Sequence, residues 1–430
     1  MTSIDTKRIA RIGFWLGDVS AEHGGIAPYA LRVLTTLLSN AEPGWRIVLL
    51  CAGAPPLRIN QLAALHPELL AVEPIPDRPV ASRPRTLDGI GARFRRQATS
   101  RPSWHYLQDW LARLELDLLH FPTQTLLHPD MQTPYCLTMY GIEERPHLVL
   151  PVPYIITMHD VQELHFPENF TPAQRAIRAV QYWKALEKAC AVIVSFDHVK
   201  QDLIKFFRLP EEKIRVCPIP FRDISLRETT LAAAESYARK YEAWTPFLLY
   251  PAHTWRHKNH LRLLEALREL RKIDGQNLKL ICTGGTAHHY HAEVLAQVDE
   301  MKLSDAVLFR GIVPEDELRW LYEHAALVTI PTKYEAGSFP LFEAMLLGSP
   351  VICSHVTSLP ETIGDRRFVF DPDNAESLAS LILRMLTDAS FRQENLANSA
   401  AQAERLRKIN AAAYFYDAYR QLLTTPSDSL

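Results

Sequence analysis

The sequence predicts an α/β protein with two domains, each built on a parallel sheet that helices cover on both faces. Short apolar runs alternate with longer amphipathic segments over most of the chain, which is typical of strands joined by crossover helices. The short runs are apolar throughout, as expected of strands buried on both faces of a sheet. The length of 430 residues is too great for one ordinary domain and favours two or three.

In the first half of the chain, five apolar runs are predicted as strands and four amphipathic patterns as helices. The predicted strands are IARIGFWL, RIVLLC, DLLHFP, YIITMHD and AVIVSF. The predicted helices are APYALRVLTTLLS, WHYLQDWLARLEL, PAQRAIRAVQYWKALEKAC and HVKQDLIKFF. Their apolar residues recur every three or four positions, which is the helical period.

The second half repeats the alternation with FLLYPA, LKLICTGG, AVLFRG, ALVTIP and PVICSH as strands and intervening helical patterns. A proline-rich stretch and a polar helical pattern at 219–246 separate the halves and are typical of a hinge. The predicted domains are therefore 1–225 and 226–390, followed by a helical segment, 391–430. Its last helix is expected to pack back on the first domain.

Two segments interrupt the pattern. Residues 76–101 are rich in Pro and Arg, and residues 122–153 hold six prolines, so both are predicted as insertions. The arginine-rich segment is either a solvated loop or a surface that contacts an anionic membrane.

Composition excludes several classes. The 47 Lys and Arg balance the 49 Asp and Glu, so no nucleic-acid partner is expected. The six scattered cysteines form no C-x-x-C pair and are predicted as buried thiols in a reducing compartment. The start of the chain does not resemble a signal peptide, and no apolar run reaches 18 residues. A cytoplasmic protein is expected, with peripheral attachment to the inner face of the membrane left open.

The strongest chemical signal is PTKYEAGSFPLFEAMLLGSPV at 331–351. A strand ends, a turn carries Glu335, Gly337 and Ser338, and a helix is predicted to begin near Pro340. Free amides at such a helix start lie beyond the carboxyl end of the strand, where open α/β sheets bind ligands. Glu335 and Glu343, with Glu343 placed in the first helical turn, can both point into that crevice and accept hydrogen bonds from hydroxyl pairs.

A second signal is YPAHTWRHKNHLRLLEAL at 250–267. Its loop carries His253, Arg256, His257 and Lys258, and a helix is predicted to open near Asn259. Cations beside a helix start suit a diphosphate, because amides and ammonium both stabilise charge on a leaving group. The alternative is a solvated basic helix start.

Two weaker signals lie in the first half. Gly24 and Gly25 precede a helix, where glycine lets the backbone approach a phosphate, although such a pair is usually only a turn. The pattern G-x-G-x-x-G is absent, which argues against a dehydrogenase. His159 and Asp160 follow the YIITM strand, and a lone histidine there is either structural or part of a site.

The segment with Glu335 and Glu343 resembles the paired-glutamate motif of retaining glycosyltransferases of the large group-1 family, which have the GT-B fold of two Rossmann-like domains facing across a cleft. The resemblance is specific over roughly 245–385 and weaker over 10–40 and 154–220. It implies an acceptor-side first domain and a second domain that binds a nucleotide diphosphate-sugar. It also implies metal-independent transfer onto a glycan or lipid-linked acceptor, in surface polysaccharide or lipid-linked glycan synthesis, with no separate cofactor.

The resemblance also implies roles for individual residues. Glu343 would hold the donor ribose, and Glu335 with the amides of Gly337, Ser338 and Phe339 would hold the donor sugar and phosphate. Lys258 occupies the family's lysine position. His159 would contact the donor sugar, with its ring oriented by Asp160, and Gly24 and Gly25 would face the diphosphate.

The sequence departs from the family pattern at two positions. The usual Gly-Arg pair is Ala252-His253, and His257 replaces an arginine. Fewer permanent charges then face the diphosphate, and Arg256 is a candidate to compensate. An epimerase or phosphorylase on the same fold and an inactive scaffold remain alternatives. The histidines of TAHHYH at 286–291 have no ligand partner at metal spacing, so no metal site is expected.

Overall fold

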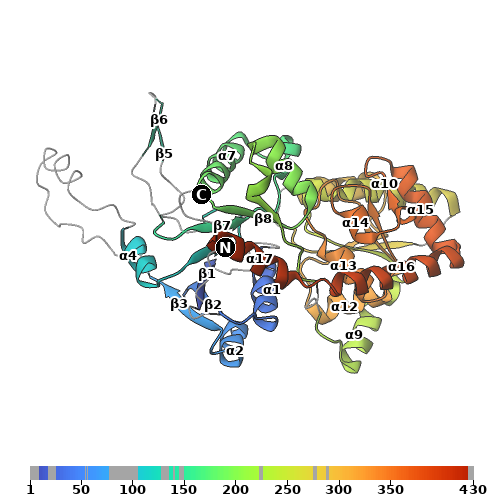
Figure 1. The fold of residues 1–430 in the computed structure, drawn as a ribbon. Helices are drawn as coiled ribbons and strands as arrows, with labels where there is room; N and C mark the ends of the chain where they lie inside the picture. The colour runs from blue at the N-terminus through green and yellow to red at the C-terminus, as the bar shows by residue number, and fades with distance from the viewer. Residues whose placement is uncertain are drawn as a thin grey trace, which may run out of the picture. The chain divides into compact units, whose positions relative to one another are not determined.

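In the computed structural model, the chain divides into two compact units (Figure 1). The first unit takes in the chain up to Val161, Pro172–Ile219 and the residues from Ala411 onward, and the second takes in Gln162–Thr171 and Pro220–Asn410. The first unit boundary falls near 219, close to the expected 225, whereas the second falls near 410, 20 residues beyond the expected 390. The chain makes an additional crossing at 162–171. The structure describes residues 9–17, 26–53, 55, 57–76, 105–126, 135–138, 141–144, 150–221, 226–274, 278–286 and 290–424.

The first unit is built on a parallel sheet of seven strands in the order β3-β2-β1-β4-β7-β8-β9. The five predicted strands all form, and β3 and β9 join them at the two edges. The strands are β1 (Ala10–Gly17), β2 (Trp45–Ala52), β3 (Leu70–Ile75), β4 (Leu118–Phe121), β7 (Tyr154–Thr157), β8 (Ala191–Val194) and β9 (Ile214–Val216).

The helices of the first unit follow the predicted amphipathic patterns, with α2 as an addition. They are α1 (Ile26–Ser39), α2 (Leu57–Leu65), α4 (His105–Arg113), α7 (Pro172–Glu187) and α8 (Asp197–Phe207). A separate antiparallel ribbon of β5 (Tyr135–Thr138) and β6 (Gly141–Glu144) lies in the predicted insertion 122–153. Of the arginine-rich segment 76–101, only Pro76 is among the described residues.

The second unit has a parallel sheet of six strands in the order β12-β11-β10-β13-β14-β15. The strands are β10 (Phe247–Pro251), β11 (Lys279–Thr283), β12 (Val307–Phe309), β13 (Leu327–Ile330), β14 (Val351–Ser354) and β15 (Val369–Phe370). Its helices are α6 (Gln162–His165), α9 (Leu231–Tyr241), α10 (His260–Asp274), α11 (Tyr290–Glu300), α12 (Glu315–His324), α13 (Phe339–Leu346), α14 (Leu359–Ile363), α15 (Ala375–Thr387) and α16 (Ala389–Arg407).

The last helix, α17 (Ala411–Thr424), packs on the first unit beside α1, which confirms the expectation for the C-terminal helix (Figure 1). The Tyr416 hydroxyl donates to the Leu37 carbonyl at 2.8 Å. The Tyr419 hydroxyl lies 2.8 Å from Nδ1 of His120, whose Nε2 lies 3.0 Å from the Thr157 hydroxyl. His120 is completely buried, and burial lowers its pKa to about 3, so its ring is neutral and offers one donor and one acceptor.

Two further expectations concern cysteines and membrane spans. The five cysteines whose side chains are described are free thiols, and Cys190 alone among them is not fully buried. Cys136 lies in β5, whose side chains fall outside the description. Over the described part of the chain, no helix is long and apolar enough to cross a membrane.

Candidate functional site

The site residues of the second unit gather at the carboxyl ends of β10 and β13. These two strands are neighbours in the middle of the sheet, yet the chain runs outward from β10 through β11 and β12 before it returns to β13. Strand order therefore reverses between them, and open α/β sheets bind ligands outside the carboxyl ends of strands at such a switch point. The loops after β10 and β13 carry Lys258 and Glu335, as the sequence predicted for a shared crevice.

The loop after β10 is held by hydrogen bonds on both sides of Lys258. A short 3₁₀ turn, Arg256–Lys258, is followed by Asn259 at φ 61°, and α10 then begins at His260. The buried Asn259 side-chain amide donates to the Pro331 carbonyl at 2.9 Å and to the Pro372 carbonyl at 2.8 Å. The Tyr250 hydroxyl donates to the Lys258 carbonyl at 2.7 Å. The backbone that presents Lys258 is therefore fixed to β10, β13 and the end of β15.

The loop after β13 is fixed in a similar way. The Thr357 hydroxyl donates to the Glu335 carbonyl at 2.7 Å. The Ser338 side chain caps α13 by accepting from the Leu341 amide at 3.3 Å, and α13 begins at Phe339. Gly337, Ser338 and Phe339 thus lie where the sequence placed them, at the start of a helix.

Lys258 and Glu335 form an ion pair, with 2.6 Å between Nζ and Oε2. Their side chains are 19% and 15% exposed, so the pair is partly shielded from solvent. Of the expected site residues, these two are brought into direct contact, although they stand 77 positions apart in the chain.

Glu343 is held by a tyrosine that the sequence analysis did not single out. The Tyr322 hydroxyl of α12 donates to Oε2 of Glu343 at 2.9 Å. Burial, with the Glu343 charge and this hydrogen bond, raises the pKa of Tyr322 well above its usual value. Glu343 is the fifth residue of α13, so its expected place in the first helical turn was wrong by one residue. The helix starts at Phe339, which moves Glu343 into the second turn.

His253 is locked by the turn after β11. The Gly285 amide donates to Nδ1 of His253 at 2.8 Å, so the proton of the neutral ring lies on Nε2. A Cβ at Gly285 would come within 2.4 Å of the same Nδ1, and Gly284 has φ +109°. Desolvation and the Lys258 ammonium lower the pKa of His253. This residue therefore offers one neutral N–H donor in place of an arginine's permanent charge.

Arg256 points to a different partner. Its guanidinium forms a two-pronged pair with Glu293 of α11 at 2.8 and 2.9 Å and lies 4.4 Å from the centre of the Tyr290 ring. The expectation that Arg256 compensates for the missing charge would require it to leave this pair.

In the first unit, His159 follows the carboxyl end of β7. Its Nε2 donates to the Pro122 carbonyl at 3.1 Å, and its ring meets Tyr29 edge to face at 4.7 Å. Burial lowers the pKa of His159 to about 4, so the ring is neutral at physiological pH and its Nδ1 is an acceptor. Asp160 accepts from the Gln124 side chain at 3.2 Å. Gly24 and Gly25 lie outside the described residues.

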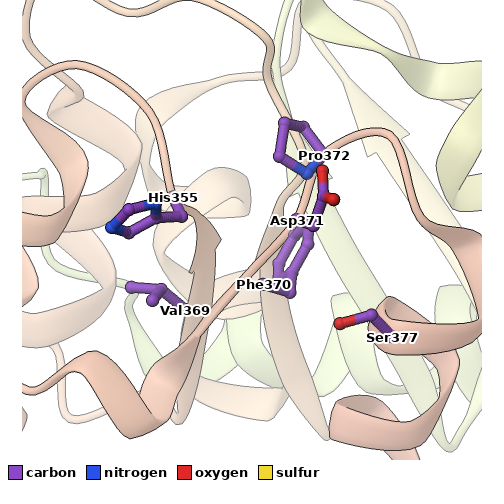
Figure 2. Close-up of a pocket in the computed structure, with 6 residues that line it drawn as sticks. All are labelled: His355, Val369, Phe370, Asp371, Pro372 and Ser377. Atoms are coloured by element: carbon purple, nitrogen blue, oxygen red, sulfur yellow. The ribbon is translucent and has the colours of Figure 1, made fainter.

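A pocket of about 370 Å³ opens at the carboxyl ends of β14 and β15, next to the start of α15 (Figure 2). Pro372, on its wall, accepts the hydrogen bond from Asn259, so the pocket borders the Lys258 loop. None of its residues was predicted from the sequence, because nothing local marks them. They are His355, Val369, Phe370, Asp371, Pro372 and Ser377.

Within the described part of the chain, no three His, Cys, Asp or Glu side chains gather in a group that could hold a metal ion. Of the TAHHYH segment, the description covers Thr286, Tyr290 and His291.

Comparisons with known proteins find similarity to glycosyl transferases. Residues 239–404 match the family model described as glycosyl transferases group 1. The chain is 28% identical over 319 residues to the O-antigen chain mannosyltransferase B of Escherichia coli, covering 73% of this chain and 83% of the relative.

Solved structures show the same fold. Sucrose-phosphate synthase from Thermosynechococcus elongatus matches with a TM-score of 0.64 and 20% identity over 96% of this chain and 99% of its own. HepE from Anabaena, in complex with UDP and glucose, matches with a TM-score of 0.64 and 16% identity over 97% and 100%.

The two parallel-sheet units thus have the fold of GT-B glycosyltransferases. The match of residues 239–404 to the group-1 family model and the relatives named as mannosyltransferases support a group-1 glycosyltransferase of the hexosyltransferase type. The epimerase, phosphorylase and inactive-scaffold alternatives gain no support from these relatives.

Proposed function

We propose that the protein transfers a hexosyl group from a nucleotide diphosphate-sugar to a hydroxyl of a glycan or lipid-linked acceptor, with retention of the anomeric configuration. The observation that carries this proposal is the ion pair between Lys258 and Glu335, with 2.6 Å between Nζ and Oε2, at the switch point of the second sheet. One side chain suits a diphosphate and the other suits sugar hydroxyls, and each is presented by a loop that leads into a helix.

The donor would take its contacts mainly from the second unit. Lys258 and the Nε2–H of His253 would bind diphosphate oxygens, and the amides of Gly337, Ser338 and Phe339 would add to them. Glu343, with its carboxylate oriented by Tyr322, would accept from the ribose hydroxyls. His159 would accept a sugar hydroxyl at Nδ1, since its Nε2–H is already donated to Pro122.

In the proposed reaction, the bond between the anomeric carbon and the phosphate oxygen breaks, and the acceptor oxygen bonds to the same carbon from the same face. The acceptor proton passes to the departing diphosphate. The chain's own contribution is positioning and fixed charge, because Lys258 stabilises the negative charge that develops on the diphosphate. No protein nucleophile is required.

The relative named as an O-antigen chain mannosyltransferase supports mannose as the transferred sugar and a surface polysaccharide as the product. Cytoplasmic location, with peripheral membrane contact through 76–101, belongs to the same proposal, since lipid-linked acceptors are presented at a membrane surface.

A thermal-shift screen tests donor binding. The protein is heated with UDP, GDP, ADP and dTDP, and with the glucose and mannose derivatives of each. A ligand at a hundred times its dissociation constant stabilises the native state by about 2.7 kcal/mol, so one nucleotide series should raise the melting temperature. A flat response across all the series would contradict the proposal.

A further inference from the structure

The Lys258–Glu335 pair joins two groups that the proposed function assigns to different parts of one donor. Tyr250 donates to the Lys258 carbonyl and Thr357 to the Glu335 carbonyl, and the Lys333 amide joins the two loops by donating to the His257 carbonyl at 2.7 Å. The two side chains therefore meet because the loops hold them there. In this arrangement the ammonium is neutralised by the carboxylate.

A bound diphosphate must change this pairing. Its oxygens would draw the ammonium of Lys258 away, which leaves Glu335 as a partly buried carboxylate without its partner and close to a second anion. Breaking a shielded ion pair from one side is costly because the remaining charge is uncompensated. Sugar hydroxyls next to the diphosphate can donate to the freed carboxylate, whereas a nucleoside diphosphate alone has no such group.

We propose that Glu335 discriminates between the sugar nucleotide and its diphosphate product by competing with the diphosphate for Lys258. The inference rests on the proposed function and extends it. When the sugar is present, both partners of the ion pair find new partners in the donor. After transfer the sugar is no longer present, so the Lys258–Glu335 ion pair re-forms. The diphosphate then loses its contact with the ammonium, which favours its release.

The test compares dissociation constants of a nucleoside diphosphate and of its sugar derivative, measured by calorimetry on the full chain. The nucleotide is the one that the thermal-shift screen selects. Glu335→Gln keeps the shape of the side chain but removes its charge, so it should bind the diphosphate about tenfold more tightly than the unmodified protein. The preference for the sugar derivative should shrink by at least the same factor.

Glu265→Gln is the matched control. It removes one carboxylate from a partly exposed pair with Arg262 on α10, so it changes the net charge equally and should leave both constants unchanged. Glu335→Ala is the second variant, and it should shift the diphosphate constant in the same direction as Glu335→Gln. Melting curves without ligand confirm that each variant is folded.

The results separate the two claims. If the unmodified protein binds no nucleoside diphosphate or sugar derivative, the proposed function fails. If it binds them and both Glu335 variants bind the diphosphate no more tightly, the discrimination by Glu335 is overturned while the proposed function stands. An equal gain in Glu265→Gln would also overturn it, because the effect would then be one of net charge.

Discussion

At the scale of single residues, the site combines a small number of charges with neutral groups whose protonation is set by neighbours. Lys258 meets Glu335, and Glu343 meets Tyr322. His253 is confined to one tautomer by the Gly285 amide, because a proton on Nδ1 would face that N–H. Charging His253 would therefore cost a hydrogen bond. We expect this residue to act as a neutral donor.

The residue-scale prediction concerns Lys258 and Glu343. Lys258→Ala should lower the rate of transfer by about a hundredfold or more, because a fixed charge at the leaving group is lost. Glu343→Gln should raise the KM for the donor more than it lowers kcat, since a ribose contact serves ground state and transition state alike. Steady-state kinetics with the nucleotide selected above would measure both.

Lys272→Ala is the control for Lys258, because it removes an exposed lysine of α10 that pairs with Glu269. It should transfer sugar at the normal rate. Unimpaired turnover by Lys258→Ala would contradict the assignment of the lysine.

At the scale of elements, the site depends on how each strand-end loop is tied to its neighbours. The 3₁₀ turn after β10 passes into α10 through Asn259, and one side-chain amide of this residue links the ends of β13 and β15 to the loop. The pattern of a strand, a loop and a helix follows from local sequence. The link between loops does not, because its partners lie 72 and 113 positions away.

The element-scale prediction concerns this link. Asn259→Ala should lower the free energy of unfolding by about 2–4 kcal/mol, because two buried carbonyls lose their donor and φ 61° is strained for alanine. Asn259→Gly loses the same hydrogen bonds without the strain, so it should be about 1 kcal/mol more stable than the alanine variant. Urea denaturation followed by circular dichroism measures both. A loss below about 0.5 kcal/mol for alanine would show that the link contributes little.

At the scale of the whole molecule, each unit holds a buried, neutral histidine. His120 lies in the first unit and His260 in the second, with exposed fractions of 0% and 1%. Burial lowers the pKa of each to about 3. Neither ring nitrogen of His260 has a hydrogen-bond partner among the described residues. Both histidines therefore make folding sensitive to acid.

The whole-molecule prediction follows from linkage. Between about pH 6.5 and pH 3, the unfolded chain binds a proton at each of these histidines and the folded chain does not. Stability is therefore highest above pH 6.5 and falls as the pH is lowered, by about 1.4 kcal/mol per pH unit for each histidine. Urea denaturation at pH 7.5, 6.0 and 5.0 measures the slope, before most carboxylates titrate. His120→Gln should reduce the slope of the first unit, and equal stability at all three pH values would contradict the prediction.

The α/β class, most strands and helices, and the two loops that carry Lys258 and Glu335 could be predicted from the sequence. These features depend on local apolar periodicity, on Pro and Gly positions and on helix starts, all of which can be read within about 20 residues. The edge strands β3, β9 and β15 were missed. Strands β9 and β15 have three residues or fewer, which is too short for a periodic pattern, and Glu73 and Pro74 interrupt the apolar run of β3.

Which side chains contact one another depends on how the elements pack in three dimensions. The strand order, the Lys258–Glu335 pair, the Tyr322 hydroxyl on Glu343 and the return of α17 to the first unit all join residues that are far apart in sequence. The pairing of Arg256 with Glu293 also depends on tertiary packing, because it joins the loop after β10 to α11. The physical reason is that such contacts depend on how elements pack. A motif identifies a charged side chain, whereas the packing around it selects its partner.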